Sequence, residues 1–60
     1  MNLLEHYIKE IHSVEEVERE NIRFLKVDLT YDCYGRVERD TRPFFRDEWE
    51  DAKAKGYFMA

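Results

Sequence analysis

The clearest pattern in the chain is an alternation of apolar and polar residues between Arg23 and Tyr31. Apolar side chains occupy every second position, at Leu25, Val27, Leu29 and Tyr31. A period of two places such side chains on one face of a β-strand, with the polar residues on the other. We therefore predict a half-buried strand over this segment. Its apolar face supplies much of the core, whereas Phe24 lies on the polar face.

A turn and a returning strand are predicted to follow. Asp32 can accept hydrogen bonds from backbone amides ahead of it in a turn, and Gly35 can adopt a positive φ. The segment from Arg36 to Phe44 then predicts the partner strand. Because Pro43 cannot donate a hydrogen bond to a ladder, this strand is expected at an edge of the sheet. Together these segments predict an antiparallel hairpin.

One short helix is predicted between Asp47 and Gly56. Asp47 can cap the first turn, and Glu50 stands three residues later, the position from which a carboxylate reaches back to the cap. Gly56 supplies the left-handed residue on which many helices end. A short apolar strand is expected after it. With the helix packed under the sheet, the predicted core consists of Leu25, Val27, Leu29, Tyr31, Phe45, Trp49 and Ala52.

The first twenty residues are compatible with two structures. Apolar residues fall at helical spacing at Leu4, Tyr7, Ile8, Ile11 and Val14. Asn2 with Glu5 can form one capping pair, and Ser13 with Glu16 a second that starts a helical turn through Glu20. Periodicity alone therefore predicts an N-terminal helix, followed by a β-hairpin and the C-terminal helix.

A resemblance favours the other structure. The chain combines Tyr-Ile-x-x-Ile-x-Ser from Tyr7, Cys-Tyr-Gly-Arg from Cys33, a phenylalanine before an acidic helix, and a terminal Gly-Tyr-Phe-Met-Ala. This layout resembles small uncharacterised proteins from prophages and mobile elements of Gram-positive bacteria, over residues 7–60. The resemblance implies a strand over residues 7–14. The expected fold is then α+β: a three-stranded antiparallel meander, one C-terminal helix and a short last strand.

The size of the chain limits its stability. Sixty residues form one domain, 1–60, which buries only about 60% of the surface that its unfolded form exposes. The single cysteine, Cys33, cannot close an internal disulfide, so we expect self-association, as a two-fold dimer, or a protein partner. No apolar run approaches the roughly 18 residues of a membrane span, and Glu5 interrupts any signal peptide. The expected compartment is the reducing cytoplasm.

The charge pattern argues against nucleic acid as the main partner. The formal net charge is -4, whereas affinity for phosphate backbones comes from excess Lys and Arg. The acidic residues gather in two series, Glu15, Glu16, Glu18 and Glu20, and Asp47, Glu48, Glu50 and Asp51. Two acidic patches can imitate nucleic acid and block a host enzyme, although solvated loops and helix starts are the commoner reason for such residues. An acidic mimic is kept as an alternative.

The sequence carries no catalytic or metal-binding pattern. Ligand types for a metal are present at His6, His12, Asp28, Asp32 and Cys33, but neither histidine has a partner at a spacing that points both at one ion. With two glycines in all, there is no phosphate-binding loop or nucleophile elbow. We assign no catalytic, cofactor-binding or metal-binding residue, and we expect a protein that is not an enzyme.

The leading prediction is a small phage or mobile-element accessory protein that binds another protein of unknown identity. An exposed aromatic ring on a strand face commonly marks a contact surface. The predicted interaction surface consists of Phe24, Lys26, Tyr34, Tyr57 and Phe58. The alternative is a nucleic-acid-binding module that uses the aromatic and basic residues of the sheet.

Overall fold

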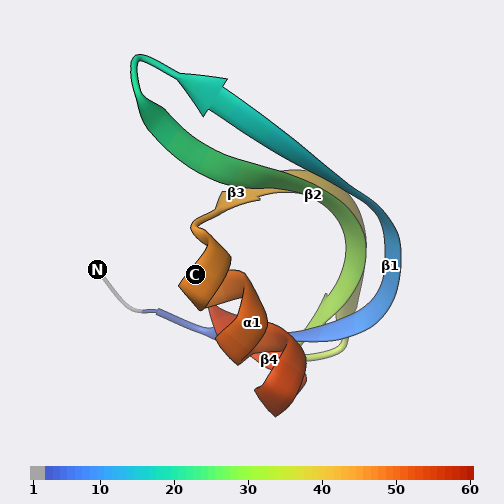
Figure 1. Cartoon of the computed structure of the whole chain (residues 1–60). Helices are drawn as coiled ribbons and strands as arrows, with labels where there is room; N and C mark the ends of the chain where they lie inside the picture. Colours follow the sequence, from blue (N-terminus) through green and yellow to red (C-terminus); the bar gives the residue numbers. More distant parts are fainter. Residues whose placement is uncertain (1–2) are drawn as a thin grey trace.

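The computed structural model describes residues 3–60 and shows an α+β fold, with one antiparallel sheet and one helix (Figure 1). The elements are β1 (Glu5–Arg19), β2 (Ile22–Cys33), β3 (Arg36–Phe44), α1 (Arg46–Lys55) and β4 (Tyr57–Met59). The four strands lie in the order β3-β2-β1-β4. The first three therefore form the expected meander, and the short last strand pairs with β1 at its beginning.

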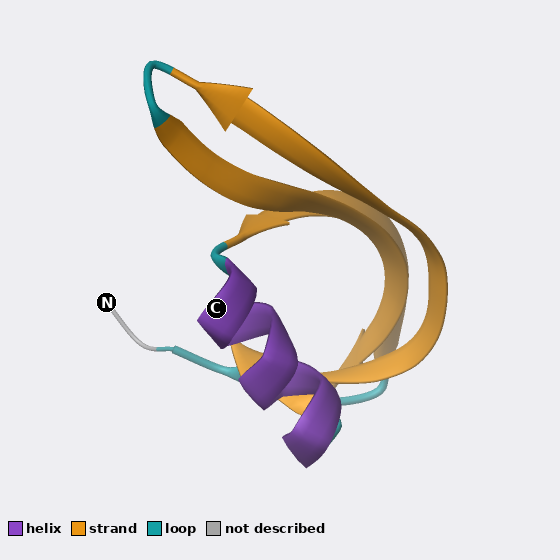
Figure 2. Ribbon diagram, viewed as in Figure 1, coloured by secondary structure: helices purple, strands orange, loops and turns teal. Residues whose placement is uncertain are grey.

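The sheet curls strongly, and α1 lies on the open side of the curl (Figure 2). The tip of the β1-β2 hairpin extends away from the helix (Figure 1). We call the side of the sheet that faces α1 the inner face and the opposite side the outer face. The curl lets one short helix cover much of the inner face. No helix within residues 3–60 is long and apolar enough to cross a membrane.

The core lies between the inner face and the helix. Its buried residues are Leu25, Val27, Leu29, Tyr31, Phe44, Trp49, Ala52 and Phe58. The four from β2 follow the alternation in the sequence, and Val27 and Leu29 are fully buried. Aromatic rings fill the space under the helix, with the Phe44 ring centre 5.2 Å from that of Trp49 and 5.1 Å from that of Phe58. Such tilted and edge-on pairs stabilise beyond the area they bury.

The prediction that Phe45 belongs to the core is wrong. Phe45 is 56% exposed, whereas its neighbour Phe44 is 8% exposed. Phe44 stands opposite Leu25 in the β2-β3 ladder, so both side chains lie on the inner face. The next residue along the chain points the other way, which carries the Phe45 ring to the outside.

Phe58 is likewise not part of an exposed surface. It is the middle residue of β4 and stands opposite His6 of β1. The Phe58 side chain is buried, with its ring edge-on to that of Tyr31 and the Arg42 guanidinium over it at 5.4 Å. A run of three apolar residues does not reveal which of them faces inward, because that depends on the register with β1.

The helix begins two residues earlier than its sequence predicts. Phe45, not Asp47, is the N-cap residue, and the Glu48 carboxylate accepts a hydrogen bond from the Phe45 backbone N–H at 3.0 Å. The start is fixed by the strand before it, since the ladder ends at Phe44 and the chain turns at once. At the other end the prediction is confirmed, because Gly56 is the C-cap at φ +85°.

The N-terminal segment is a strand, so the helical alternative is wrong for residues 5–19. The β1-β2 ladder contains two register shifts, between Ile8 and Glu10 and between Ile11 and Ser13. Each bulge inserts one extra residue, and as a result Ile8, Ile11 and Val14 all face the inner side, opposite Tyr31, Leu29 and Val27. A spacing of three on one face imitates helical periodicity. The proposed capping pair of Asn2 and Glu5 includes a residue outside the described part of the chain.

Both hairpins close through tight two-residue turns. Tyr34 and Gly35 have φ of 52° and 87°, and the Gly35 N–H donates to the Asp32 carboxylate at 2.8 Å, as the turn prediction requires. Glu20 and Asn21 have φ of 51° and 67°. Two consecutive positive φ angles match the right-handed twist of paired strands. The predicted helical turn through Glu20 is therefore a hairpin turn instead.

Candidate interaction surfaces

The four predicted surface residues that are not buried lie at two separate places on the outer face. Phe24 is half-buried and Lys26 exposed, and both belong to the half of β2 nearer the β1-β2 tip. Tyr34 lies in the β2-β3 turn, at the opposite end of β2, and Tyr57 begins β4. The sequence therefore predicted one surface where the fold makes two.

The tyrosine end is a small aromatic cluster. The rings of Tyr7 and Tyr57 lie 5.5 Å apart on neighbouring strands, and the Tyr7 hydroxyl donates a hydrogen bond to the Glu5 carboxylate. This hydrogen bond, followed by partial desolvation and by the charge of Glu5, raises the pKa of Tyr7. The hydroxyl is consequently neutral at physiological pH and serves as a hydrogen-bond group, with no role as an acid or base.

The middle of the outer face is a closed polar network. Arg39 donates two hydrogen bonds to the Asp28 carboxylate, at 3.0 and 2.9 Å, and the His12 ring lies 2.8 Å from the Thr30 hydroxyl. Hydrogen bonding from Arg39 lowers the pKa of Asp28, and the same pair raises the pKa of Arg39. The arginine is thus neutralised by its partner. Little positive charge is left here for a phosphate backbone.

The residues with metal-ligand chemistry are not brought together. The His6 ring lies on the inner face, packed on Tyr31 and Phe58 at 4.9 and 5.1 Å between ring centres. His12, beyond the bulges, contacts Thr30 on the outer face. The expectation that a strand would place both histidines on one face is therefore wrong. Among residues 3–60 no group of three His, Cys, Asp or Glu side chains is arranged to hold a metal ion.

An apolar groove lies where β3 passes into α1. It has a volume of about 270 Å³ and is lined by Ile22, Phe24, Pro43, Phe44, Phe45 and Glu48. We call this set of residues the aromatic groove. Ile22 is 53% exposed and Phe45 56% exposed, so two large apolar side chains project into solvent at its rim. The carboxylate of Glu48 is engaged with the helix start, which leaves the groove almost entirely apolar.

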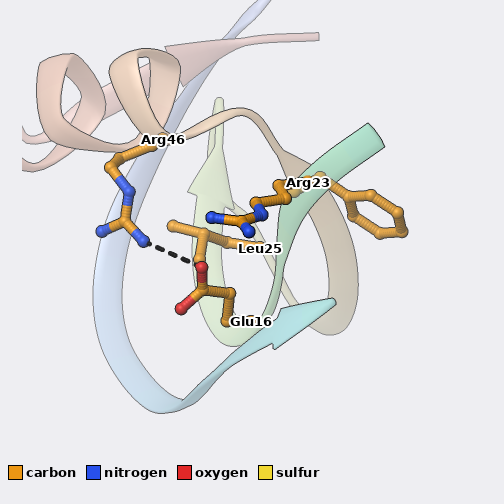
Figure 3. Close-up of a pocket in the computed structure, with 5 residues that line it drawn as sticks. Glu16, Arg23, Leu25 and Arg46 are labelled. Carbon is orange, nitrogen blue, oxygen red and sulfur yellow. Dashed lines mark ion pairs between the residues drawn. The ribbon is translucent and has the colours of Figure 1, made fainter. Parts of the chain in front are cut away.

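The acidic series of β1 is divided by the strand geometry. Glu16 stands opposite Leu25 on the inner face and pairs with Arg46 at 3.4 Å (Figure 3), while Glu18 pairs with Arg23 at 2.8 Å. Glu15 stands opposite Lys26 on the outer face. Because alternate residues of a strand face opposite sides, these glutamates do not form one acidic patch. The fold therefore gives no support to the nucleic-acid mimic.

Comparison with known proteins leaves these surfaces to be interpreted from their geometry. No family model matches the chain, and neither a curated protein nor a solved structure matches it. Sequence patterns pointed to Phe24 but missed Ile22, Pro43 and Phe45. One available signal was the Phe44-Phe45 pair, since adjacent residues at a strand end point in opposite directions and only one of them can enter the core.

Proposed function

We propose that this protein is a small non-enzymatic binding protein that docks on another protein through the aromatic groove. The observation that supports the proposal is the exposure of Ile22 and Phe45 at the rim of an apolar depression. The fold does not need these two side chains outside, because the core is complete without them. An origin in a phage or mobile element rests on the sequence resemblance and is part of the same proposal.

The energetics of the groove fit a protein contact. Removing an Ile or Phe side chain from water contributes about 1.5 to 3 kcal/mol. Aromatic residues at the centre of an interface commonly dominate its binding energy, with surrounding contacts that exclude water. The groove is too small for a whole interface of about 800 Å² per partner. It is therefore an anchor within a larger contact, one that takes an apolar side chain of the partner.

A test compares the capture of proteins by matched variants. Immobilised wild-type protein, the groove variant Ile22→Ser with Phe45→Ser, and the control Val37→Ser are exposed to the same lysate. Val37 is 60% exposed and lies outside the groove, so it matches the change in chemistry. We expect a protein that binds the wild type and the control but not the groove variant, and that forms a defined complex when purified. Equal capture by all three would reject the groove as the binding site.

Nucleic-acid binding is the second candidate, and one observation favours it. A shallow depression on the outer face brings Arg19, Lys26 and Arg42 near the half-buried ring of Phe24, with Glu15 as the acidic residue in its lining. Basic residues around an aromatic ring are the elements of a single-strand site. The net charge of -4 opposes this function. Micromolar binding of labelled single-stranded or duplex nucleic acid, weakening as salt rises, would replace the protein-binding proposal.

A further inference from the structure

One long edge of the sheet has no neighbour. β4 pairs with β1 only at residues Glu5, His6 and Tyr7, with one more hydrogen bond from the Ile8 N–H to the Gly56 carbonyl. On that side, β1 continues to Arg19 without a pairing strand. An unpaired edge presents free backbone N–H and C=O groups, which can pair with another chain.

The free part of this edge is regular from Ser13 to Arg19. The two bulges lie before Ser13, and beyond them each residue of β1 pairs with one residue of β2. In a hairpin with a two-residue turn, the pair next to the turn exchanges its backbone hydrogen bonds and every second pair does the same. Counting from Arg19 and Ile22, the backbone groups of Val14, Glu16 and Glu18 face outward. Seven regular residues offer a docking edge of about 23 Å.

The opposite edge of the sheet, at β3, is protected. The same counting from the pair of Cys33 and Arg36 places Val37, Arg39, Thr41 and Pro43 with their outward groups on the open side. Pro43 has no N–H to offer there, and β3 carries charged side chains on both faces. Proline and charge on an edge are ordinary protection against strand addition. The β1 edge lacks a proline, so the two edges differ in what they can accept.

The side chains along the β1 edge define the chemistry of a guest strand. Residues 13–19 carry three glutamates and one arginine, so this stretch is acidic. On the inner face Ile11 and Val14 are 43% and 46% exposed, although they continue the apolar surface of the core. Beside Val14 a depression of about 340 Å³ extends to Trp49. A guest strand with apolar side chains on its inner face and basic side chains on its outer face covers the first and neutralises the second.

We propose that the edge of β1 from Ser13 to Arg19 binds an extended segment of a partner protein whose residues alternate between apolar and basic, added to the sheet as a fifth strand. In this mode the backbone ladder supplies affinity and the alternate side chains supply specificity. The proposal deepens the proposed function, since it names the chemistry of a partner, but it uses a surface separate from the aromatic groove.

A second copy of the chain does not fit this edge. Two-fold antiparallel pairing of β1 with itself requires that residues on the same face stand opposite one another. With the axis at Glu15 or at Glu16, that glutamate faces its own copy; with the axis at Val17, Glu16 faces Glu18 twice. Like charges directly opposite each other destabilise a sheet. Each of these registers therefore contains a glutamate pair, which a basic partner segment avoids.

The test uses the full-length protein and a synthetic nine-residue peptide of alternating valine and lysine. Binding is measured by calorimetry, and amide hydrogen exchange locates the contact. We expect one peptide per chain, slower exchange at Val14, Glu16 and Glu18, and no change at Val37, Arg39 and Thr41 of β3. A peptide N-methylated at alternate residues keeps the charge but cannot form the ladder, so it is expected to lose the binding.

Charge variants test the chemistry of the contact. Glu15→Lys is expected to weaken peptide binding about fivefold or more at low salt, whereas Glu50→Lys on the helix, with the same change in charge, leaves it unchanged. Equal binding of the N-methylated peptide, or unchanged exchange at the β1 amides, would overturn the proposal. Protection of those amides without peptide, together with a doubled mass, would assign the edge to a second copy. Phe45→Ser is expected not to affect peptide binding, so the groove and the edge can fail separately.

Discussion

Replacement of two adjacent phenylalanines by alanine is predicted to have opposite consequences. Phe44 is buried against the rings of Trp49 and Phe58, whereas more than half of Phe45 is exposed. Truncation of a buried Phe to Ala typically costs about 3 to 5 kcal/mol, and two aromatic pairs are lost with it. A 60-residue domain has only a few kcal/mol of stability. We therefore expect Phe44→Ala to be largely unfolded at 25 °C.

Phe45→Ala is the matched control, because the composition of the two variants is identical. A surface substitution usually changes stability by less than about 0.5 kcal/mol, and the N-cap role of Phe45 uses only its backbone. Phe44→Leu keeps an apolar side chain and is expected to lose about 1 kcal/mol or more. This milder variant gives a measurable transition even where Phe44→Ala does not fold.

The assay is urea unfolding, followed by the fluorescence of Trp49 and by circular dichroism. With a slope of about 1 kcal/mol per molar urea for a small protein, a loss of 3 kcal/mol moves the midpoint by about 3 M. Phe45→Ala is expected to shift it by less than about 0.5 M. An equal loss of stability in Phe44→Ala and Phe45→Ala would contradict the inward and outward directions assigned to the two rings.

Three further predictions concern turns, charge and association. Tyr34→Asn is expected to raise the free energy of unfolding by about 0.5 to 1 kcal/mol, because asparagine before Gly35 suits the positive φ of this turn; an unchanged or lower urea midpoint would contradict this. The lowered pKa of Asp28 means that its pairing with Arg39 stabilises the fold above the ordinary value of 3.8 and is lost as the pH falls through the lower folded pKa. Asp28→Asn is therefore expected to be less stable than the wild type at pH 7, and a gap in urea midpoint that did not narrow below pH 3.8 would refute this. The isolated chain is expected to self-associate through its exposed apolar groove, with a partner replacing the second copy; a sedimentation mass of 7.4 kDa at high micromolar concentration would reject this, and a dimer lost on reduction would implicate Cys33.

The sequence predicted the β2-β3 hairpin well because its signals are local. Alternation in β2, the Asp32 and Gly35 turn and the edge proline each act over a few residues, and none of them depends on packing elsewhere. The same holds for Gly56, whose left-handed conformation ends the helix. In these segments the local preferences and the tertiary structure agree, which is typical of sequences that specify one fold.

The first strand shows what local pattern cannot provide. The two bulges shift the phase of β1, so inner-face residues follow one another at a spacing of three and suggest a helix. A bulge is a property of the pair of strands, because it is defined by the register with β2. Pattern within one segment therefore favoured the wrong element there. The resemblance to other proteins gave the strand, since it was not based on periodicity.

The binding surfaces were only partly predictable for a similar reason. Phe24 was identified because its ring interrupts the polar side of an alternating strand. Phe45 was assigned to the wrong side, and the aromatic groove joins residues from β2, β3 and the start of α1, which only the fold brings together. The open edge of β1 depends on how far β4 extends, and nothing in the sequence of β1 itself determines that length.

The most direct test of the protein-binding function is site-specific photo-crosslinking at two equally exposed positions. A photoreactive phenylalanine analogue is placed at position 45, at the groove rim, or at position 37, on the outer face of β3. The native side chains there are 56% and 60% exposed, so access to solvent is matched. The proposal predicts that position 45 forms a covalent adduct with one protein partner and that position 37 does not. Adducts with nucleic acid, or equal adducts from both positions, would contradict it.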